Sequence, residues 1–174
     1  KSIKKMKQTD NFKFDEANVM NELVYRNLSE DAKRQICAWK YGGEYDLYNL
    51  PAYEEMQVRQ IGFMNPKSEK NYYGFWDESI LVGFVNILEE KEEVFIGIGV
   101  NPDLCNKHYG QRMLLITYEI SKKLYPNKPL YLEVRTWNIR AVKCYQKAGF
   151  RIDGQAYELT TGIGTGTFYR MIRE

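Results

Sequence analysis

The stretch that decides the fold covers residues 132–150 and reads LEVRTWNIRAVKCYQKAGF. At its start, apolar Leu132 and Val134 alternate with charged Glu133 and Arg135. A period of two is typical of a strand whose two faces meet different surroundings. The first part of the stretch therefore predicts a strand that carries a glutamate on its more polar face.

The rest of the stretch has the pattern of a helix with both ends marked. Asn138 suits the N-cap, because its side-chain oxygen can accept from a free backbone N–H of the first turn. Ala141, Tyr145 and Ala148 then recur at helical spacing and form one face. Gly149 fits the left-handed position that ends many helices. We therefore expect a helix that carries Tyr145 directly after the strand.

The totals of the sequence exclude several classes of protein. With 174 residues and a globular composition, the chain is expected to form one domain with a substantial core. A net charge of +2 gives no reason to expect nucleic acid or an anionic membrane as a partner. The sequence has neither an apolar run that could span a bilayer nor a signal-peptide pattern.

The cysteine and histidine content bears on redox compartment and metals. Cys37, Cys105 and Cys144 are widely spaced and odd in number, which argues against a disulfide framework and favours a reducing cytoplasm. A single histidine and scattered cysteines give no metal-ligand spacing. We expect a cytoplasmic protein without a metal site.

The chain divides into a short extension and one domain. Residues 1–20 are rich in lysine and poor in apolar side chains, so we expect them to lie outside the core, with the domain spanning 21–174. The element order is β-α-α-β-β-β-α-β-α-β-β. The expected strands cover 22–28, 71–76, 80–88, 94–100, 130–135, 154–159 and 167–172, and the helices 30–40, 52–63, 111–125 and 139–148. The third helix has a predicted buried stripe of Met113, Ile116, Ile120 and Leu124.

The strand at 94–100, VFIGIGV, places two glycines on one face. Val94, Ile96 and their alternate neighbours face one way, whereas Gly97 and Gly99 face the other. Glycines inside a strand mark either a bulge or a close approach by another group. The pattern by itself leaves both interpretations open.

After this strand, a loop leads into a helix that starts at Gly110. Backbone N–H groups are unsatisfied at such a start and the helix dipole is positive there, which suits a phosphate. Lys107 and Arg112 add positive charge. Many strand–loop–helix junctions bind nothing, so the feature needs support from the rest of the chain.

Together, the segments 97–115 and 132–150 resemble the GNAT superfamily of acetyl-CoA-dependent N-acetyltransferases. The resemblance runs from about residue 22 to the C-terminus, and the second segment is most similar to the branch that acetylates protein N-termini, including those of ribosomal proteins. It implies an α/β (α+β) fold with a mixed, mostly antiparallel sheet and helices on both faces. Two central parallel strands, here 94–100 and 130–135, would splay apart and hold the cofactor between them.

The resemblance also implies the residues that bind acetyl-CoA. The end of the first splayed strand would pair with pantetheine amides, and the loop 105–110 would bind the pyrophosphate. Cys105 and His108 depart from the family pattern, which usually has Gln or Arg and Gly at these positions. The implied cofactor-binding residues are Ile98, Gly99, Val100, Cys105, Asn106, Lys107, His108, Tyr109, Gly110, Gln111, Asn138 and Tyr145.

Two residues match the family positions that carry the chemistry. The resemblance implies that Tyr145 is the acid that protonates the departing thiolate, and that Glu133 is the base for the acceptor amine. Structural alternatives stay open for each: Tyr145 as core packing, Asn138 as an N-cap only, and Glu133 as a surface charge paired with Arg135.

The acceptor side is expected between the first two helices and the last hairpin. Glu44, Tyr45 and Tyr48 would contact an amine there, or would serve only as loop anchors. The leading hypothesis is direct acetyl transfer to a primary amine, such as a peptide N-terminus. The alternatives are a small-amine acetyltransferase acting on an aminoglycoside, polyamine or amino acid, and a CoA-binding sensor without catalysis. A homodimer is left open.

Overall fold

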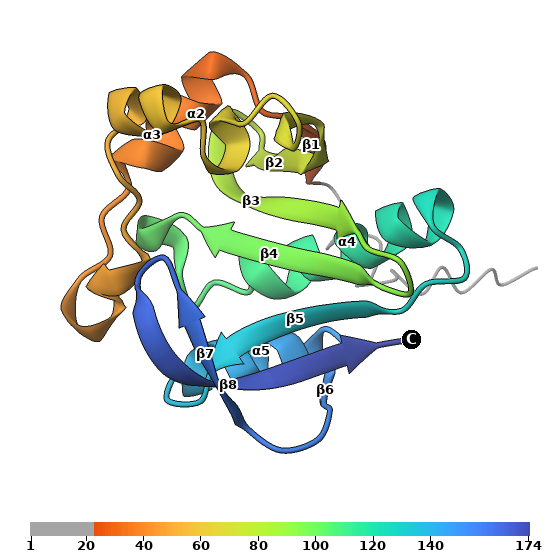
Figure 1. Ribbon diagram of the computed structural model, residues 1–174. Helices are drawn as coiled ribbons and strands as arrows, with labels where there is room; N and C mark the ends of the chain where they lie inside the picture. Colours follow the sequence, from red (N-terminus) through yellow and green to blue (C-terminus); the bar gives the residue numbers. More distant parts are fainter. Residues whose placement is uncertain (1–22) are drawn as a thin grey trace, which may run out of the picture.

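The structure is a computed structural model that describes residues 23–174 (Figure 1). The predicted extension 1–20 lies outside the described residues. The strands are β1 (Val24–Asn27), β2 (Tyr72–Asp77), β3 (Ile80–Glu89), β4 (Val94–Val100), β5 (Leu130–Arg135), β6 (Arg151–Ile152), β7 (Tyr157–Thr161) and β8 (Gly164–Arg173). The α-helices are α2 (Glu30–Ala38), α3 (Tyr53–Arg59), α4 (Tyr109–Leu124) and α5 (Ile139–Lys147). Short 3-10 helices are η1 (Gly43–Tyr48), η2 (Gly62–Met64), η3 (Glu69–Asn71) and η4 (Pro102–Leu104).

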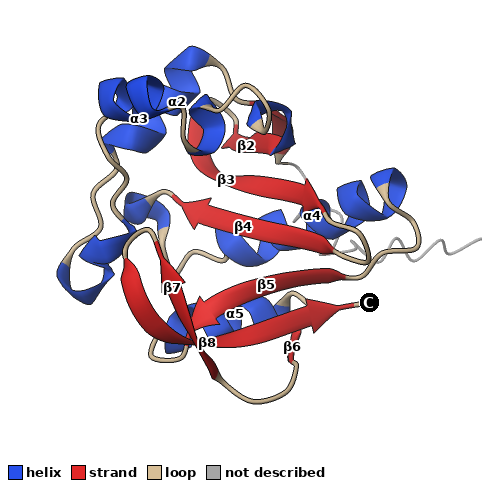
Figure 2. Cartoon of the chain, viewed as in Figure 1, coloured by secondary structure: helices blue, strands red, loops and turns tan. Residues whose placement is uncertain are grey.

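All the strands belong to one sheet, in the order β1-β2-β3-β4-β5-β8-β6, with β7 paired to β8. Every pairing is antiparallel except that of β4 with β5. The parallel pair holds at only two positions, Val94 with Leu130 and Phe95 with Tyr131. Beyond these residues β4 and β5 diverge, as Figure 2 shows. The predicted mixed sheet with two splayed central strands is therefore confirmed.

Helices cover both faces of this sheet. Buried residues of α4 and α5, such as Met113 and Val142, pack with β3, β4, β5 and β8 in the larger core cluster. On the other face, α2 and α3 contribute Ile36 and Met56 to a second cluster with Trp76 and neighbouring strand residues. The burial of alternate strand residues on each face supplies most of the driving force for this layering.

The ends of the helices follow local signals. Ser29 accepts from the Ala32 backbone N–H as the predicted N-cap of α2. Asn138 does the same for Ala141 at the start of α5, and Gly149 takes a left-handed φ of 91° after that helix. Both predicted ends of the helix that carries Tyr145 are thus confirmed.

Some predicted boundaries are wrong. The helix expected over 52–63 ends at Arg59, because Gln60 adopts a left-handed conformation with φ 50°. Leu124 is 50% exposed instead of buried, since the last turn of α4 extends past the strands (Figure 1). The expected loop at 160–166 is mostly strand, with β7 and β8 turning at residues 162–163. The two-residue strand β6 was too short to show a period.

Candidate functional site

The divergence of β4 from β5 opens a cavity of about 610 Å³. It is lined by both strands, by the loop before α4, by α5 and by the η1 segment. All the predicted site residues line it except Lys107 and Glu44. Those that do are Ile98, Gly99, Val100, Cys105, Asn106, His108, Tyr109, Gly110, Gln111, Glu133, Asn138, Tyr145, Tyr45 and Tyr48.

The predicted phosphate loop keeps a backbone that suits glycine. His108, which stands at a family glycine position, has φ 64° and ψ 10°, and Asn106 also has φ 64°. Left-handed geometry costs a residue with a side chain roughly 1–2 kcal/mol. The histidine therefore adopts the conformation that a glycine would favour, and α4 begins directly after it with its first N–H groups at the cavity.

Gly110, in the first turn of α4, has a packing role. A Cβ placed on it would lie 3.0 Å from the Cys144 sulfur of α5 and 3.5 Å from a Val100 methyl. A contact of 3.0 Å is too close for an ordinary Cβ, so the missing side chain lets α4 approach α5. This approach brings the N-terminus of α4 beside the open ends of the two strands.

The two glycines of β4 differ. The ladder of β3 with β4 is continuous from Gly83 to Glu89, so the alternative interpretation as a bulge is wrong. A Cβ on Gly99 would overlap the Phe84 ring, which already fills that space. A Cβ on Gly97 would make only ordinary contacts, the nearest at 3.5 Å from the Asn86 Cβ. Only Gly97 therefore leaves room on the cavity side.

Tyr145 projects from α5 into the cavity. Burial raises the pKa of Tyr145 above its ordinary value of about 10, and nearby Cys144 and Tyr48 act in the same direction. Within residues 23–174, its hydroxyl has no hydrogen-bond partner. A tyrosine in this state stays protonated near neutral pH and can donate to a group that enters the cavity.

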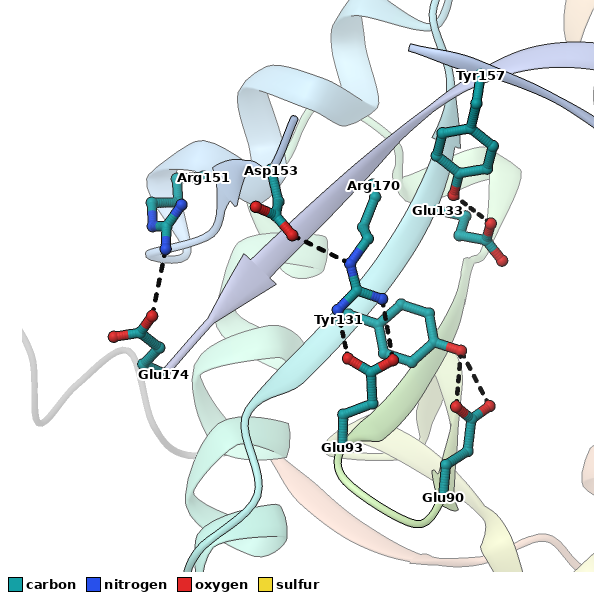
Figure 3. Close-up of polar contacts among 9 residues, drawn as sticks. All are labelled: Glu90, Glu93, Tyr131, Glu133, Arg151, Asp153, Tyr157, Arg170 and Glu174. Carbon is teal, nitrogen blue, oxygen red and sulfur yellow. Dashed lines mark hydrogen bonds and ion pairs between the residues drawn. The ribbon is translucent and has the colours of Figure 1, made fainter. Parts of the chain in front are cut away.

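Glu133 lies on β5 and accepts a hydrogen bond from the hydroxyl of Tyr157 on β7 (Figure 3). The alternative in which Glu133 pairs with Arg135 is wrong. Burial, followed by this hydrogen bond, raises the pKa of Tyr157, so the phenol stays a donor. Figure 3 also shows Arg170 of β8 held by Glu93 and Asp153. The Glu133 carboxylate that lines the cavity is therefore held by a residue of β7.

Asn138 joins α5 to the η1 segment. Its Oδ1 caps the helix, and its Nδ2 donates to the Tyr48 hydroxyl at 3.2 Å. Tyr48 and Tyr45 both pack on Trp137, with ring centroids 6.1 and 5.6 Å apart from it. The predicted acceptor tyrosines thus anchor their loop and line the cavity at the same time.

Several cavity residues were not among the predicted site residues. The Tyr41 hydroxyl donates to the Val100 carbonyl at 2.6 Å, across 59 positions. Arg135 and Arg140 line the cavity; Lys143 and Lys147 do so from the basic face of α5. The helical spacing of the α5 residues could have indicated them, whereas nothing local marks Tyr41.

The comparisons agree with this geometry. The family model described as "Acetyltransferase (GNAT) family" matches residues 33–150, and the chain belongs to this family. It is an acetyl-CoA-dependent N-acetyltransferase. No curated protein shows a significant match to the sequence.

Solved structures share the fold at low identity. A spermidine N-acetyltransferase from Vibrio cholerae, solved with CoA and spermine, has a TM-score of 0.69 and 17% identity, covering 87% of this chain and 94% of its own. A GNAT-family acetyltransferase from Streptococcus pneumoniae has a TM-score of 0.63 and 24% identity, covering 87% and 98%. One from Bacillus anthracis has a TM-score of 0.67 and 16% identity, covering 87% and 93%.

Two further findings concern residues 23–174. No group of three or more His, Cys, Asp or Glu side chains in this part could hold a metal ion. None of its helices combines the length and apolar character needed to cross a membrane.

Proposed function

We propose that this N-acetyltransferase acts on an acceptor with a single primary amine, with Glu133 as base and Tyr145 as acid. The observation that carries the proposal is that both side chains line one cavity, Glu133 from β5 and Tyr145 from α5. Acetyl transfer to an amine needs a group that accepts a proton from the amine and one that donates a proton to the departing sulfur.

Residues of the loop and helix start would hold acetyl-CoA. The left-handed backbone at Asn106 and His108 and the first turn of α4 offer N–H donors for phosphates, while Lys143 and Lys147 add positive charge at the same cavity. Gly97 leaves room between the strands. When bound, acetyl-CoA supplies the activated acetyl group as a thioester.

Tyr145 is suited to the acid role by its protonation state. Because burial raises its pKa, the hydroxyl remains protonated at any working pH near neutrality. Its hydroxyl has no hydrogen-bond partner among residues 23–174, so donation to sulfur would break no existing contact in that part of the chain. Proton donation from Tyr145 would lower the barrier mainly at the stage at which negative charge develops on sulfur.

Glu133 is suited to the base role by its position. Tyr157 occupies one carboxylate oxygen, Oε2, which leaves Oε1 to accept the amine proton. The hydrogen bond also restricts the rotamers of the Glu133 side chain, so the carboxylate is already oriented before the reaction begins.

The charge of the cavity favours a monoamine over a polyamine. The structural neighbours include spermidine N-acetyltransferases, which makes a polyamine the second candidate. However, Glu133 is the one carboxylate among the described residues that line the cavity, so a second ammonium would find no acidic partner there, and Arg135 and Arg140 would repel it. A polycation would meet more repulsion than attraction there.

A two-stage assay tests the proposal. Calorimetric titration with acetyl-CoA should show binding at one site per chain, and an acceptor screen that detects free thiol should favour monoamines over spermidine. The Glu133→Gln variant should bind acetyl-CoA normally and lose turnover, with partial recovery at high pH, where the free amine is more abundant. Spermidine as the best acceptor would contradict the charge argument.

A further inference from the structure

Arg135, the last residue of β5, is a nearly buried cation without a partner. It is 8% exposed and lines the cavity. Within residues 23–174, no carboxylate pairs with its guanidinium and no hydrogen bond involves it. A guanidinium offers five N–H donors, and those of Arg135 are unused but keep some access to the cavity, since no Arg135 nitrogen is both fully buried and unpaired. The feature therefore indicates a group that arrives from outside the described chain.

The surroundings hold the guanidinium in place but do not neutralise it. Its central carbon lies 4.9 Å from the centroid of the Phe168 ring on β8. Gly166 of the same strand has no side chain, and a Cβ there would overlap Arg135 Nη1. The guanidinium thus lies against the β8 backbone and an aromatic face, a setting that orders a cation without supplying an anion.

The other arginines nearby are satisfied differently. Arg170 is gripped by both carboxylate oxygens of Glu93 and by Asp153 (Figure 3). Arg140 is exposed to solvent and stacks on the Tyr45 ring at 4.0 Å. Arg135, by contrast, is only 8% exposed to solvent and has no carboxylate partner within residues 23–174. Glu133, which faces the same way two residues earlier on the strand, is held by Tyr157.

We propose that Arg135 binds a carboxylate of the acceptor, so that the substrate class is an amino carboxylic acid. This rests on the proposed function, because it places the acceptor amine at Glu133. The planar fork of a guanidinium matches a carboxylate through two parallel hydrogen bonds. Glu133 and Arg135, on one face of β5, present a base and an anion site side by side, which is the pattern of an ammonium and a carboxylate on one small molecule.

The test compares acids with their amides. Glycine, β-alanine, 4-aminobutyrate and L-phenylalanine would each be assayed against the corresponding primary amide, which has the same shape but no negative charge. Wild-type protein should prefer at least one acid about tenfold or more in kcat/KM, as expected for a charge-assisted pair. The same acid should raise the Tm of the protein in the presence of CoA, whereas its amide should not.

Variants separate binding from folding. Arg135→Met keeps the length of the side chain and removes the charge, so the acid preference should disappear while Tm stays equal or rises, since an unpartnered buried charge is lost. Arg135→Lys should retain only part of the preference, because it lacks the fork. Arg140→Gln removes one charge from the same cavity and should leave the acid-to-amide ratio unchanged within about twofold.

The outcomes distinguish this proposal from the proposed function. If wild type acetylates acids and amides alike, the carboxylate site is wrong while the transferase assignment stands. If no acid is acetylated or raises Tm, the carboxylate site is likewise wrong. If Arg135→Met weakens acetyl-CoA binding in calorimetry, Arg135 serves the cosubstrate and the proposal is overturned. Loss of all activity in Glu133→Gln and Tyr145→Phe bears only on the proposed function.

Discussion

The hydroxyl of Tyr157 on β7 donates a hydrogen bond to the carboxylate of Glu133 on β5, although the two strands are not neighbours in the sheet. Strand β8 lies between them, pairing Tyr157 with Phe168 and Glu133 with Arg170. The side chain of Tyr157 therefore extends across β8 to reach the candidate base (Figure 3). We therefore propose Tyr157 as a positioning residue for the reaction.

Replacing Tyr157 by Phe should lower kcat by about tenfold, because the Glu133 carboxylate loses the hydrogen bond that fixes its orientation toward the amine. The KM for acetyl-CoA should not change. Activity should partly recover at high pH, where the amine needs less help in losing its proton. The control is Tyr131→Phe, which removes a hydroxyl bound to Glu90 on the same face. An equal loss in both variants would show that Tyr157 acts through general packing.

The raised pKa of Tyr145 predicts the alkaline side of the pH profile. A phenol with an ordinary pKa of about 10 would lose its proton at lower pH than one raised by burial. As an acid, Tyr145 should therefore support a kcat that does not fall between pH 8 and about 10. Tyr145→Phe should lower kcat by about 10²–10⁴-fold with unchanged acetyl-CoA affinity. Near-normal kcat for this variant, with chemistry limiting, would remove the tyrosine from the mechanism.

The two glycines of β4 should respond differently to alanine. Gly99→Ala forces a Cβ into the Phe84 ring and should lower the free energy of unfolding by about 1–3 kcal/mol. Gly97→Ala meets only ordinary contacts, so stability should change by less than about 0.5 kcal/mol while acetyl-CoA binding weakens. Denaturant unfolding and calorimetry measure these effects. Unaltered affinity in Gly97→Ala would mean that the space beside this residue is not used.

His108 offers a test of backbone strain in the phosphate loop. His108→Gly should raise the free energy of unfolding by up to about 1 kcal/mol, because glycine adopts a φ of 64° without steric cost. Acetyl-CoA affinity should be preserved, since the contacts assigned to this loop come from the backbone. His108→Ala keeps the strain and should show no such gain. A marked loss of affinity in both variants would instead assign the imidazole a direct contact.

Much of the fold was readable from local sequence. The alternation at Leu132 and Val134, the cap at Asn138 and the glycine at 149 each act within a few residues, so their effect can be predicted without knowing the tertiary structure. The family pattern then indicated the splay of two parallel strands and a set of site residues of which all but Lys107 and Glu44 line the cavity. The short strand β6 was not predicted, because it depends on pairing with β8. The end of α3 before Gln60 was not predicted, because it depends on the backbone conformation of that one residue.

The tertiary structure alone decided which side chains meet. The sequence by itself determined the strand that carries Glu133 and the helix that carries Tyr145, through periodicity and capping. It did not determine that Tyr157, 24 positions away, would donate to Glu133. It also did not determine that Tyr41 would donate to the Val100 carbonyl across 59 positions. It left Arg135 as a plausible partner for Glu133, whereas strand register and the Phe168 ring place its guanidinium apart and unpaired within residues 23–174. Hydrogen bonds between distant side chains depend on register and packing, and these are set only when the whole sheet has formed.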